Sequence, residues 1–245
     1  MSFQSPAEEN NRSLRFQELM DTVTSLSYDE FLEIKYDRTY PTPLRSQPYD
    51  EEKLLNQDPS QHKKLEKSIR LLNAWNRSTR KDNEVAVLFL LAKDALYQHY
   101  LKHDAIEDID YINAIDTATH QLMKAYGTIE VPLGDFQRHR RGAVDIAIGG
   151  GADVIAAMYS RPDEDGKYKA YVGETYIQMV RFDKEQGPII ESINAYGSSA
   201  HPGDQHFTDQ MQLFADQKLK PMTLDLEQVK KEAVESYHPK MLMEH

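Results

Sequence analysis

Residues 196–210 concentrate more side chains able to do chemistry than any other part of the chain. These fifteen residues carry two histidines, two aspartates, three serine or threonine hydroxyls, two glycines and a proline. Serine, histidine and aspartate are the residue types of a nucleophile, its base and the group that orients the base. Such groups meet in space rather than along the chain, so two readings stay open. Either Ser198 or Ser199 is a nucleophile, or, as we expect, the side chains satisfy the backbone of an irregular loop.

The backbone around this segment is predicted from its flanks. Residues 189–195 are rich in β-branched residues and predict a strand, and Gly197 and Gly203 allow sharp turns after it. Thr208 or Asp209 is expected to cap a short helix, because both residue types favour that position. The helix would carry Met211, Leu213 and Phe214.

Further segments share an order and spacing with one known family. They are residues 11–20, 133–142, 149–153, 165–166, 173–180 and, last, 196–210. With these landmarks the chain resembles the carboxy-terminal part of the penicillin acylase family, which includes the acyl-homoserine lactone acylases. Several separate motifs in one order are a more specific signal than a single glycine-rich turn.

The resemblance implies an amidohydrolase of the N-terminal nucleophile class. In that class a precursor cuts itself, and the freed amino-terminal serine attacks an amide carbonyl with its own α-amine as the base. The implied substrates are N-acylated small molecules of the acyl-homoserine lactone or β-lactam type, and no cofactor or metal is implied. The implied fold stacks two antiparallel sheets between helices (αββα), and the implied partners are the rest of the precursor and the small subunit.

Arg12 is the catalytic candidate that the resemblance supplies. Residues 11–20 resemble the family's helix bearing an active-site arginine, which supports the nucleophile's surroundings and an oxyanion-hole asparagine by charge-assisted hydrogen bonds. Arg12 and Arg15 stand three residues apart and share one helical face. The alternative is a surface arginine paired with a nearby carboxylate, that of Glu8, Glu9 or Glu18.

The start of the chain departs from the family pattern. Ser2 stands ten residues before Arg12, whereas the family's nucleophile and its oxyanion-hole asparagine lie hundreds of residues before that helix. We therefore expect the chain to be a terminal portion of the large subunit that does not turn over substrate alone.

Composition excludes several classes of function. A net charge of -11, from 29 basic against 40 acidic residues, disfavours binding to duplex nucleic acid. The absence of cysteine excludes disulfides and thiol catalysis. No apolar run approaches the roughly eighteen residues of a membrane span, and the first residues lack a signal-peptide pattern. The resemblance nevertheless implies a periplasmic or secreted enzyme.

The remaining candidate groups are expected to be structural. His139, His201 and His206 lie in segments that read as loops, without the spacing that fixes metal ligands. The basic run 138–141 is expected to be a solvated turn or a set of ion pairs. Residues 149–151, three glycines, predict a bulge or tight turn between strands.

The pattern of apolar residues predicts an α+β protein with a helical first half followed by antiparallel strands. Residues 163–166 predict a hairpin turn. We expect a helical region at 1–127, a β region at 128–225 and a helix with a tail at 226–245. A helix is expected to begin at Ser27, with Glu30 placed to complete a capping box. Further helices are expected at 12–24, 61–75, 84–101 and 106–126. Strands are expected at 144–148, 154–159, 167–172, 176–182 and 189–195.

Two readings from other classes compete with the acylase portion. One is a non-catalytic acidic α+β module that binds a protein partner, which predicts stable behaviour alone and no exposed apolar sheet. The other is a stand-alone serine hydrolase using Ser198 or Ser199, which predicts labelling by a fluorophosphonate probe.

Overall fold

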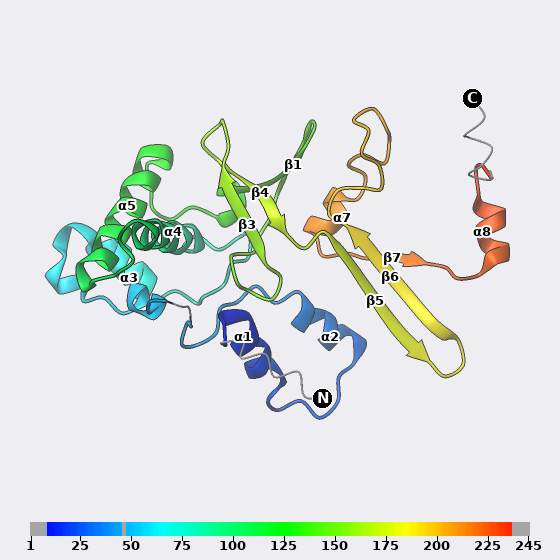
Figure 1. Ribbon diagram of the computed structural model, residues 1–245, viewed down its shortest axis with the longest axis horizontal. Coiled ribbons are helices and arrows are strands. Elements are labelled where there is room, and N and C mark those ends of the chain that lie inside the picture. Colours follow the sequence, from blue (N-terminus) through cyan, green and yellow to red (C-terminus); the bar gives the residue numbers. More distant parts are fainter. Residues whose placement is uncertain (1–8, 46–47, 237–245) are drawn as a thin grey trace.

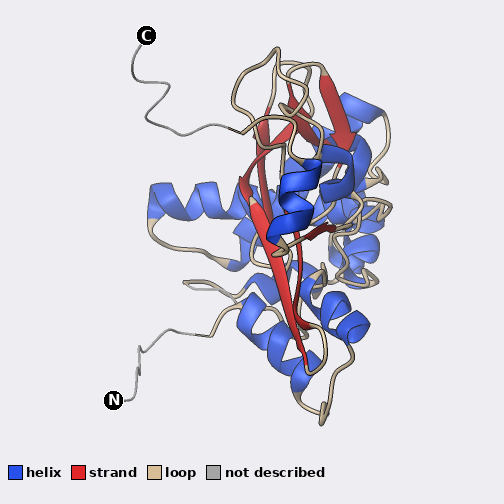
Figure 2. Cartoon of the chain, turned by 90° about the vertical axis from the view of Figure 1, so that its right-hand side faces the viewer, coloured by secondary structure: helices blue, strands red, loops and turns tan. Residues whose placement is uncertain are grey.

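The computed structural model describes residues 9–45 and 48–236. The strands form a four-stranded and a three-stranded sheet. Figure 1 shows a helical group at one end, the larger sheet in the middle and the smaller sheet beyond it, with the first helices of the chain below the sheets. Figure 2 shows the long strands with helices to both sides of them. The apolar interior forms two clusters, one among the helices and one between the sheets.

Two short helices open the described chain. Helix α1 spans Asn11–Met20 and helix α2 spans Tyr28–Lys35. The predicted capping box at Ser27 is confirmed, because its side chain accepts from the Glu30 backbone and Glu30 accepts from the Ser27 backbone. These reciprocal hydrogen bonds fix the residue at which α2 begins and the direction of the helix from there.

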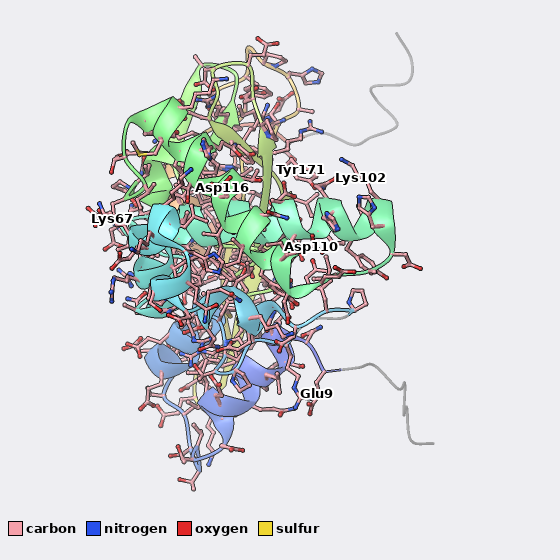
Figure 3. All side chains as sticks on the ribbon, turned by 90° about the vertical axis from the view of Figure 1, so that its left-hand side faces the viewer. Glu9, Lys67, Lys102, Asp110, Asp116 and Tyr171 are labelled. Atoms are coloured by element: carbon pink, nitrogen blue, oxygen red, sulfur yellow. The ribbon has the colours of Figure 1, made fainter. Side chains whose placement is uncertain are left out.

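The helical group contains α3 (Glu66–Asn73), α4 (Ala86–His103) and α5 (Asp108–Tyr126). Three short 3-10 segments precede α3: η1 (Glu51–Leu55), η2 (Pro59–Gln61) and η3 (Lys63–Leu65). Figure 3 views this group from outside and shows Asp110, in the first turn of α5, close to the end of α4 that carries Lys102. Tyr40, Trp75 and Phe89 form the aromatic centre of the core.

The middle sheet joins two hairpins edge to edge. It follows the one-turn helix α6 (Leu133–Phe136) and contains β1 (Gln137–Arg141), β2 (Val144–Ala147), β3 (Met158–Pro162) and β4 (Tyr168–Gly173). The order is β2-β1-β4-β3. Pairing within each hairpin is antiparallel, but β1 and β4 run parallel where the hairpins meet.

The second sheet is antiparallel throughout, in the order β5-β6-β7. Its strands are β5 (Tyr176–Asp183), β6 (Gly187–Asn194) and β7 (Lys220–Met222), and α7 (Met211–Ala215) lies between the last two in sequence. Ile177, Met179 and Ile193 are buried with Phe214 of α7. Helix α8 (Leu226–Glu232) follows and buries none of its residues.

The predicted α+β class, with helices first and mainly antiparallel strands after them, is confirmed. The hairpin turn at 163–166 is also present, closed by a hydrogen bond from Asp163 N to Lys167 O. The three predicted regions stay predictions, and the last of them runs into residues 237–245, outside the described part.

Several local predictions were wrong. The helix expected over 61–75 is broken, because His62 adopts φ -130° and ψ 63°, so α3 begins only at Glu66. The strand expected from Val154 begins at Met158, because the residues before it form a buried loop. The run 138–141 makes the expected ion pairs but lies in strand β1 rather than a turn, so His139 is in a strand and not in a loop.

Candidate functional site

The first turn of α1 docks on the loop that follows the glycine run 149–151. The backbone amide of Asn11 donates to Asp153 Oδ2 at 3.1 Å, and Arg12 Nε donates to the carbonyl of Val154 at 3.1 Å. Asn11 is fully buried, and its Oδ1 accepts from the backbone of Arg45 at 2.6 Å. The position of Arg12 is therefore fixed by segments far apart in sequence.

The carboxylates that could have neutralised Arg12 are directed elsewhere. Glu9 pairs with Arg45 at 3.6 Å and Glu18 pairs with Arg15 at 2.9 Å, while Glu8 lies outside the described residues. Within residues 9–45 and 48–236, Arg12 forms no ion pair. Its guanidinium is held through Nε by one carbonyl, so the other N–H groups can donate to a further acceptor.

Arg15, one turn further along α1, has a different role. Its Nε and Nη2 donate to the two carboxylate oxygens of Asp37 at 3.0 and 3.1 Å. The hydrogen bond to Asp37 raises the pKa of Arg15 above its usual value. This two-point contact anchors α1 to the end of α2. The two arginines thus differ in role. Arg15 anchors the helix, whereas Arg12 keeps N–H groups that can donate to a further acceptor.

Lys35 adds a second positive charge near Arg12. Burial, together with the charge of Arg12, lowers the pKa of Lys35 to about 8. Lys35 also forms an ion pair with Glu174. Sequence reasoning missed Lys35, because a lysine in the last turn of a helix is an ordinary feature there. Only the tertiary structure brings it beside Arg12.

The glycine run serves close packing. A Cβ on Gly149 would lie 2.8 Å from Lys81 N and from Thr79 O, and one on Gly151 would lie 2.9 Å from the hydroxyl of Tyr40. That hydroxyl donates to the carbonyl of Ala152 at 2.5 Å. The run lies between β2 and β3, as expected, but it is irregular rather than a bulge or tight turn, and the turns follow it within residues 152–156, in the loop that receives Arg12.

The segment 196–210 forms a self-bonded loop. His206 Nδ1 lies 2.7 Å from Asp209 Oδ2, and the His206 backbone donates to Asp204 at 2.7 Å. The Ser199 amide donates to the His206 carbonyl at 3.1 Å, and the Ser199 hydroxyl accepts from the His201 amide. Across the described residues, no hydrogen bond joins a serine hydroxyl of this loop to an imidazole ring, so the histidine–aspartate pair has no nucleophile beside it.

The short helix after this loop is present, with a different cap. Gln210 precedes α7 at the N-cap position, not Thr208 or Asp209, and it makes no capping side-chain bond. Its side chain instead accepts from the amide of Asn194 at 2.9 Å, which ties the loop to the end of β6. Met211 and Phe214 are buried as expected.

The described ranges hold neither a metal-binding cluster nor a membrane-spanning helix. They contain no cluster of three or more histidine, cysteine or acidic side chains placed to hold a metal ion. No helix in them is long and apolar enough to cross a membrane.

Comparison with known proteins decides the family. The model of the penicillin amidase family matches residues 2–231. The chain belongs to this family. The family is one of hydrolases that act on amides. Acyl-homoserine lactone acylase PvdQ of Pseudomonas savastanoi pv. phaseolicola is 31% identical over 120 residues, which are 48% of this chain and 15% of that protein.

Two PvdQ acylases from Pseudomonas fluorescens also match. One is 34% identical over 101 residues, which are 40% of this chain and 13% of that protein. The other is 28% identical over 149 residues, which are 56% of this chain and 18% of that protein. The chain thus spans less than a fifth of these relatives. Among solved structures, a thermostable penicillin G acylase from Alcaligenes faecalis aligns with 97% of this chain and 56% of its own, with 14% identity and a TM-score of 0.47.

Proposed function

We propose that this chain is the carboxy-terminal portion of the large subunit of an amidohydrolase that cleaves N-acylated small molecules, of the acyl-homoserine lactone or β-lactam type. The family match over residues 2–231 and the PvdQ relatives support the reaction class. In the complete protein, a serine outside these residues attacks the amide carbonyl, the amine leaves, and water releases the acyl group.

Within that reaction Arg12 is proposed to support the reaction centre. The observation that carries this role is the contact of Arg12 Nε with the Val154 carbonyl, which holds the guanidinium in place while leaving its other donors uncommitted. Donors fixed before the reaction cost no reorganisation when charge develops on the substrate oxygen. Lys35 adds positive charge to the same region.

The proposed partner is the rest of the acylase precursor, including its small subunit. Strand β5 stands at the edge of its sheet and exposes Tyr176, Val180 and Phe182 on one face, with 82% of Phe182 accessible. An unpaired edge and an apolar face are features that a protein covers with further structure. The competing interaction module predicted no such face, so these residues favour the acylase portion. Export to the periplasm or the medium, as the resemblance implies, is part of this proposal.

The test is a matched pair of substitutions in the longer precursor, Arg12→Gln and Arg15→Gln. We expect the unsubstituted precursor to cleave itself and to release the fatty acid from an acyl-homoserine lactone, measured by mass spectrometry and chromatography. Arg12→Gln should lower kcat by about 10²-fold, the size of effect seen when one oxyanion-stabilising donor is lost. Its unfolding midpoint should stay near that of the unsubstituted protein.

Arg15→Gln provides the contrast, because it removes an anchor rather than a donor to the reaction centre. It should cost roughly 1.5–3 kcal/mol of stability, as expected for a hydrogen-bonded charge pair. A precursor that neither self-cleaves nor hydrolyses any N-acyl substrate would overturn the proposed reaction. Full activity in the Arg12→Gln variant would overturn only the role of Arg12.

A further inference from the structure

A cavity of about 550 Å³ lies between the end of α2, the segment before α4 and the end of α7. Its lining includes Tyr36 and Arg38 from the first segment, Arg80 and Lys81 from the second, and Asp216 from the third. Neither Arg12 nor the 196–210 loop contributes to it. The cavity is therefore a separate feature from the region proposed to support amide hydrolysis.

Arg38 is a cation without a counter-ion in this cavity. Its Nε is buried and has no hydrogen-bond partner, and its side chain forms no ion pair with any residue in the described ranges. One of its terminal nitrogens lies against the backbone of Gly149, where an added Cβ would be 3.0 Å from it. The remaining N–H groups of the guanidinium can reach the cavity that it lines.

Tyr36 is a second unused donor in the same lining. Its hydroxyl is buried and unpartnered. Burial raises the pKa of Tyr36 to about 12, and the nearby charge of Arg38 acts against that rise. The hydroxyl is thus protonated at neutral pH and close enough to Arg38 to feel its charge. The Tyr36 hydroxyl and Arg38 Nε are closed to water in this structure, so a ligand in the cavity satisfies them once the two side chains turn towards it. Two buried donors left without acceptors are costly, which favours that turn when an acceptor is present.

The acidic residues of the lining do not neutralise Arg38. Asp37 is held by Arg15, while Asp216 and Asp82 lie 3.6 Å from Lys81 and Arg80 respectively. Glu33, the remaining acid of the lining, is exposed. Burial, together with the charge of Arg80, lowers the pKa of Arg38 to about 10. The ion pairs of the lining acids therefore leave Arg38 without a carboxylate partner.

We propose that this cavity binds a small oxyanion, a carboxylate or a phosphate, through the guanidinium of Arg38 and the hydroxyl of Tyr36. A guanidinium offers two parallel N–H donors that match two oxygens of either group, and the phenol supplies a third donor. The bound oxyanion would act as the counter-ion of the Arg38 guanidinium. This site does not depend on the proposed amide hydrolysis.

The test titrates the purified 245-residue chain with inorganic phosphate and with acetate, at constant ionic strength held by sodium chloride. Isothermal calorimetry and the thermal unfolding midpoint are the readouts. Saturable binding of at least one of the two anions is expected, together with a rise in the midpoint that sodium chloride alone does not give. No saturable binding of either anion, or an equal effect of chloride, overturns the proposal.

Variants assign the binding to the two donors. Arg38→Gln should abolish saturable binding, and Tyr36→Phe should weaken it by about three- to tenfold, the loss of one hydrogen bond. Arg70→Gln is the matched control, because Arg70 pairs with Glu66 on the exposed face of α3 and is absent from the cavity. If Arg38→Gln does not fold, Tyr36→Phe still decides: unchanged affinity in that variant overturns the assignment.

The same titration of the longer precursor distinguishes two sources of the oxyanion. Retained phosphate or acetate binding identifies a free small anion. Loss of that binding, combined with weaker subunit assembly in Arg38→Gln, identifies a carboxylate side chain supplied by the rest of the protein. Retained binding that Arg38→Gln does not change overturns the site.

Discussion

The imidazole of His139 stacks on the ring of Tyr196, with 4.7 Å between the ring centroids and 26° between their planes. Its Nε2 donates to the carbonyl of Ala195 at 2.5 Å. The guanidinium of Arg141 lies near the Tyr196 ring at 4.9 Å and over the Phe207 ring at 4.0 Å, and it donates to the Phe207 carbonyl. Strand β1 is therefore the support on which the loop 196–210 is built.

The buried imidazole makes stability depend on pH. Burial lowers the pKa of His139, and its bond to the Ala195 carbonyl opposes that only in part. The unfolded chain takes up a proton near pH 6.5, but the folded chain does so only at lower pH. Stability should therefore fall as the pH drops below about 6.5 towards the folded-state pKa. Chemical unfolding of the chain between pH 8 and pH 5 measures this.

His139→Gln should flatten that pH dependence and cost roughly 1–3 kcal/mol at pH 8, because a buried hydrogen bond and a ring stack are disturbed. The control is His120→Gln, since the His120 side chain is 80% exposed on α5. A pH dependence that disappears in the His120 variant but persists without His139 would contradict the assignment.

Gly197 is predicted to tolerate no side chain. A Cβ there would collide with the carbonyl of His206 and lie 2.5 Å from Asp209 Oδ1. Gly197→Ala should destabilise the chain by about 1–3 kcal/mol, as overpacking does. Gly203→Ala in the same loop is the control, because its Cβ would meet nothing within 4 Å. Equal midpoints of urea unfolding for the two variants would contradict the prediction, because they would show that the loop rearranges around the added methyl group at no cost in stability.

Arg140 is predicted to control the acidity of the β3–β4 hairpin. It donates to Asp163 at 2.8 Å and to Asp165 at 2.6 Å, and these bonds hold the pKa of both carboxyls below the usual range. Arg140→Gln should return both pKa values towards about 3.9. Carboxyl carbon shifts in an NMR titration measure this, with Arg161→Gln as the control, because Arg161 lies over the Tyr171 ring.

The same pairs have a consequence for stability. Carboxyls with a lowered folded-state pKa stabilise the fold above about pH 4 and lose that contribution as the pH falls through the folded-state pKa. The stability difference between the unsubstituted chain and Arg140→Gln should therefore shrink below about pH 4. A constant difference down to pH 2 would mean that the ion pairs do not act through these carboxyls.

The apolar face of the second sheet should bind hydrophobic dye. Replacing Val180 with Thr and Phe182 with Ser should reduce dye fluorescence while changing stability by less than about 0.5 kcal/mol, since both side chains are exposed. Met179→Thr, on the buried face of β5, should instead cost about 2 kcal/mol or more. Unchanged dye binding in the double variant would place the exposed apolar surface elsewhere.

Local sequence signals were reliable where the cause is local. The capping box at Ser27, the end of the helix at residue 126 and the hairpin turn at 163–166 each depend on residues within a few positions, and each is present. Strand β1 was missed because its run of Arg and His reads as a polar turn. It pairs with β2, which follows after two residues, and with β4, whose distant position in the sequence does not indicate the pairing.

By itself the sequence determined the class of fold, the family resemblance and Arg12 as the candidate on the first helix. Only the tertiary structure decided what surrounds that arginine, because Val154 and Lys35 reach it from separate segments. It also decided that His139 is a buried support and that Arg38 lacks a counter-ion. Propensity and capping act over a few residues, whereas burial and charge pairing depend on groups that meet only when the chain has folded.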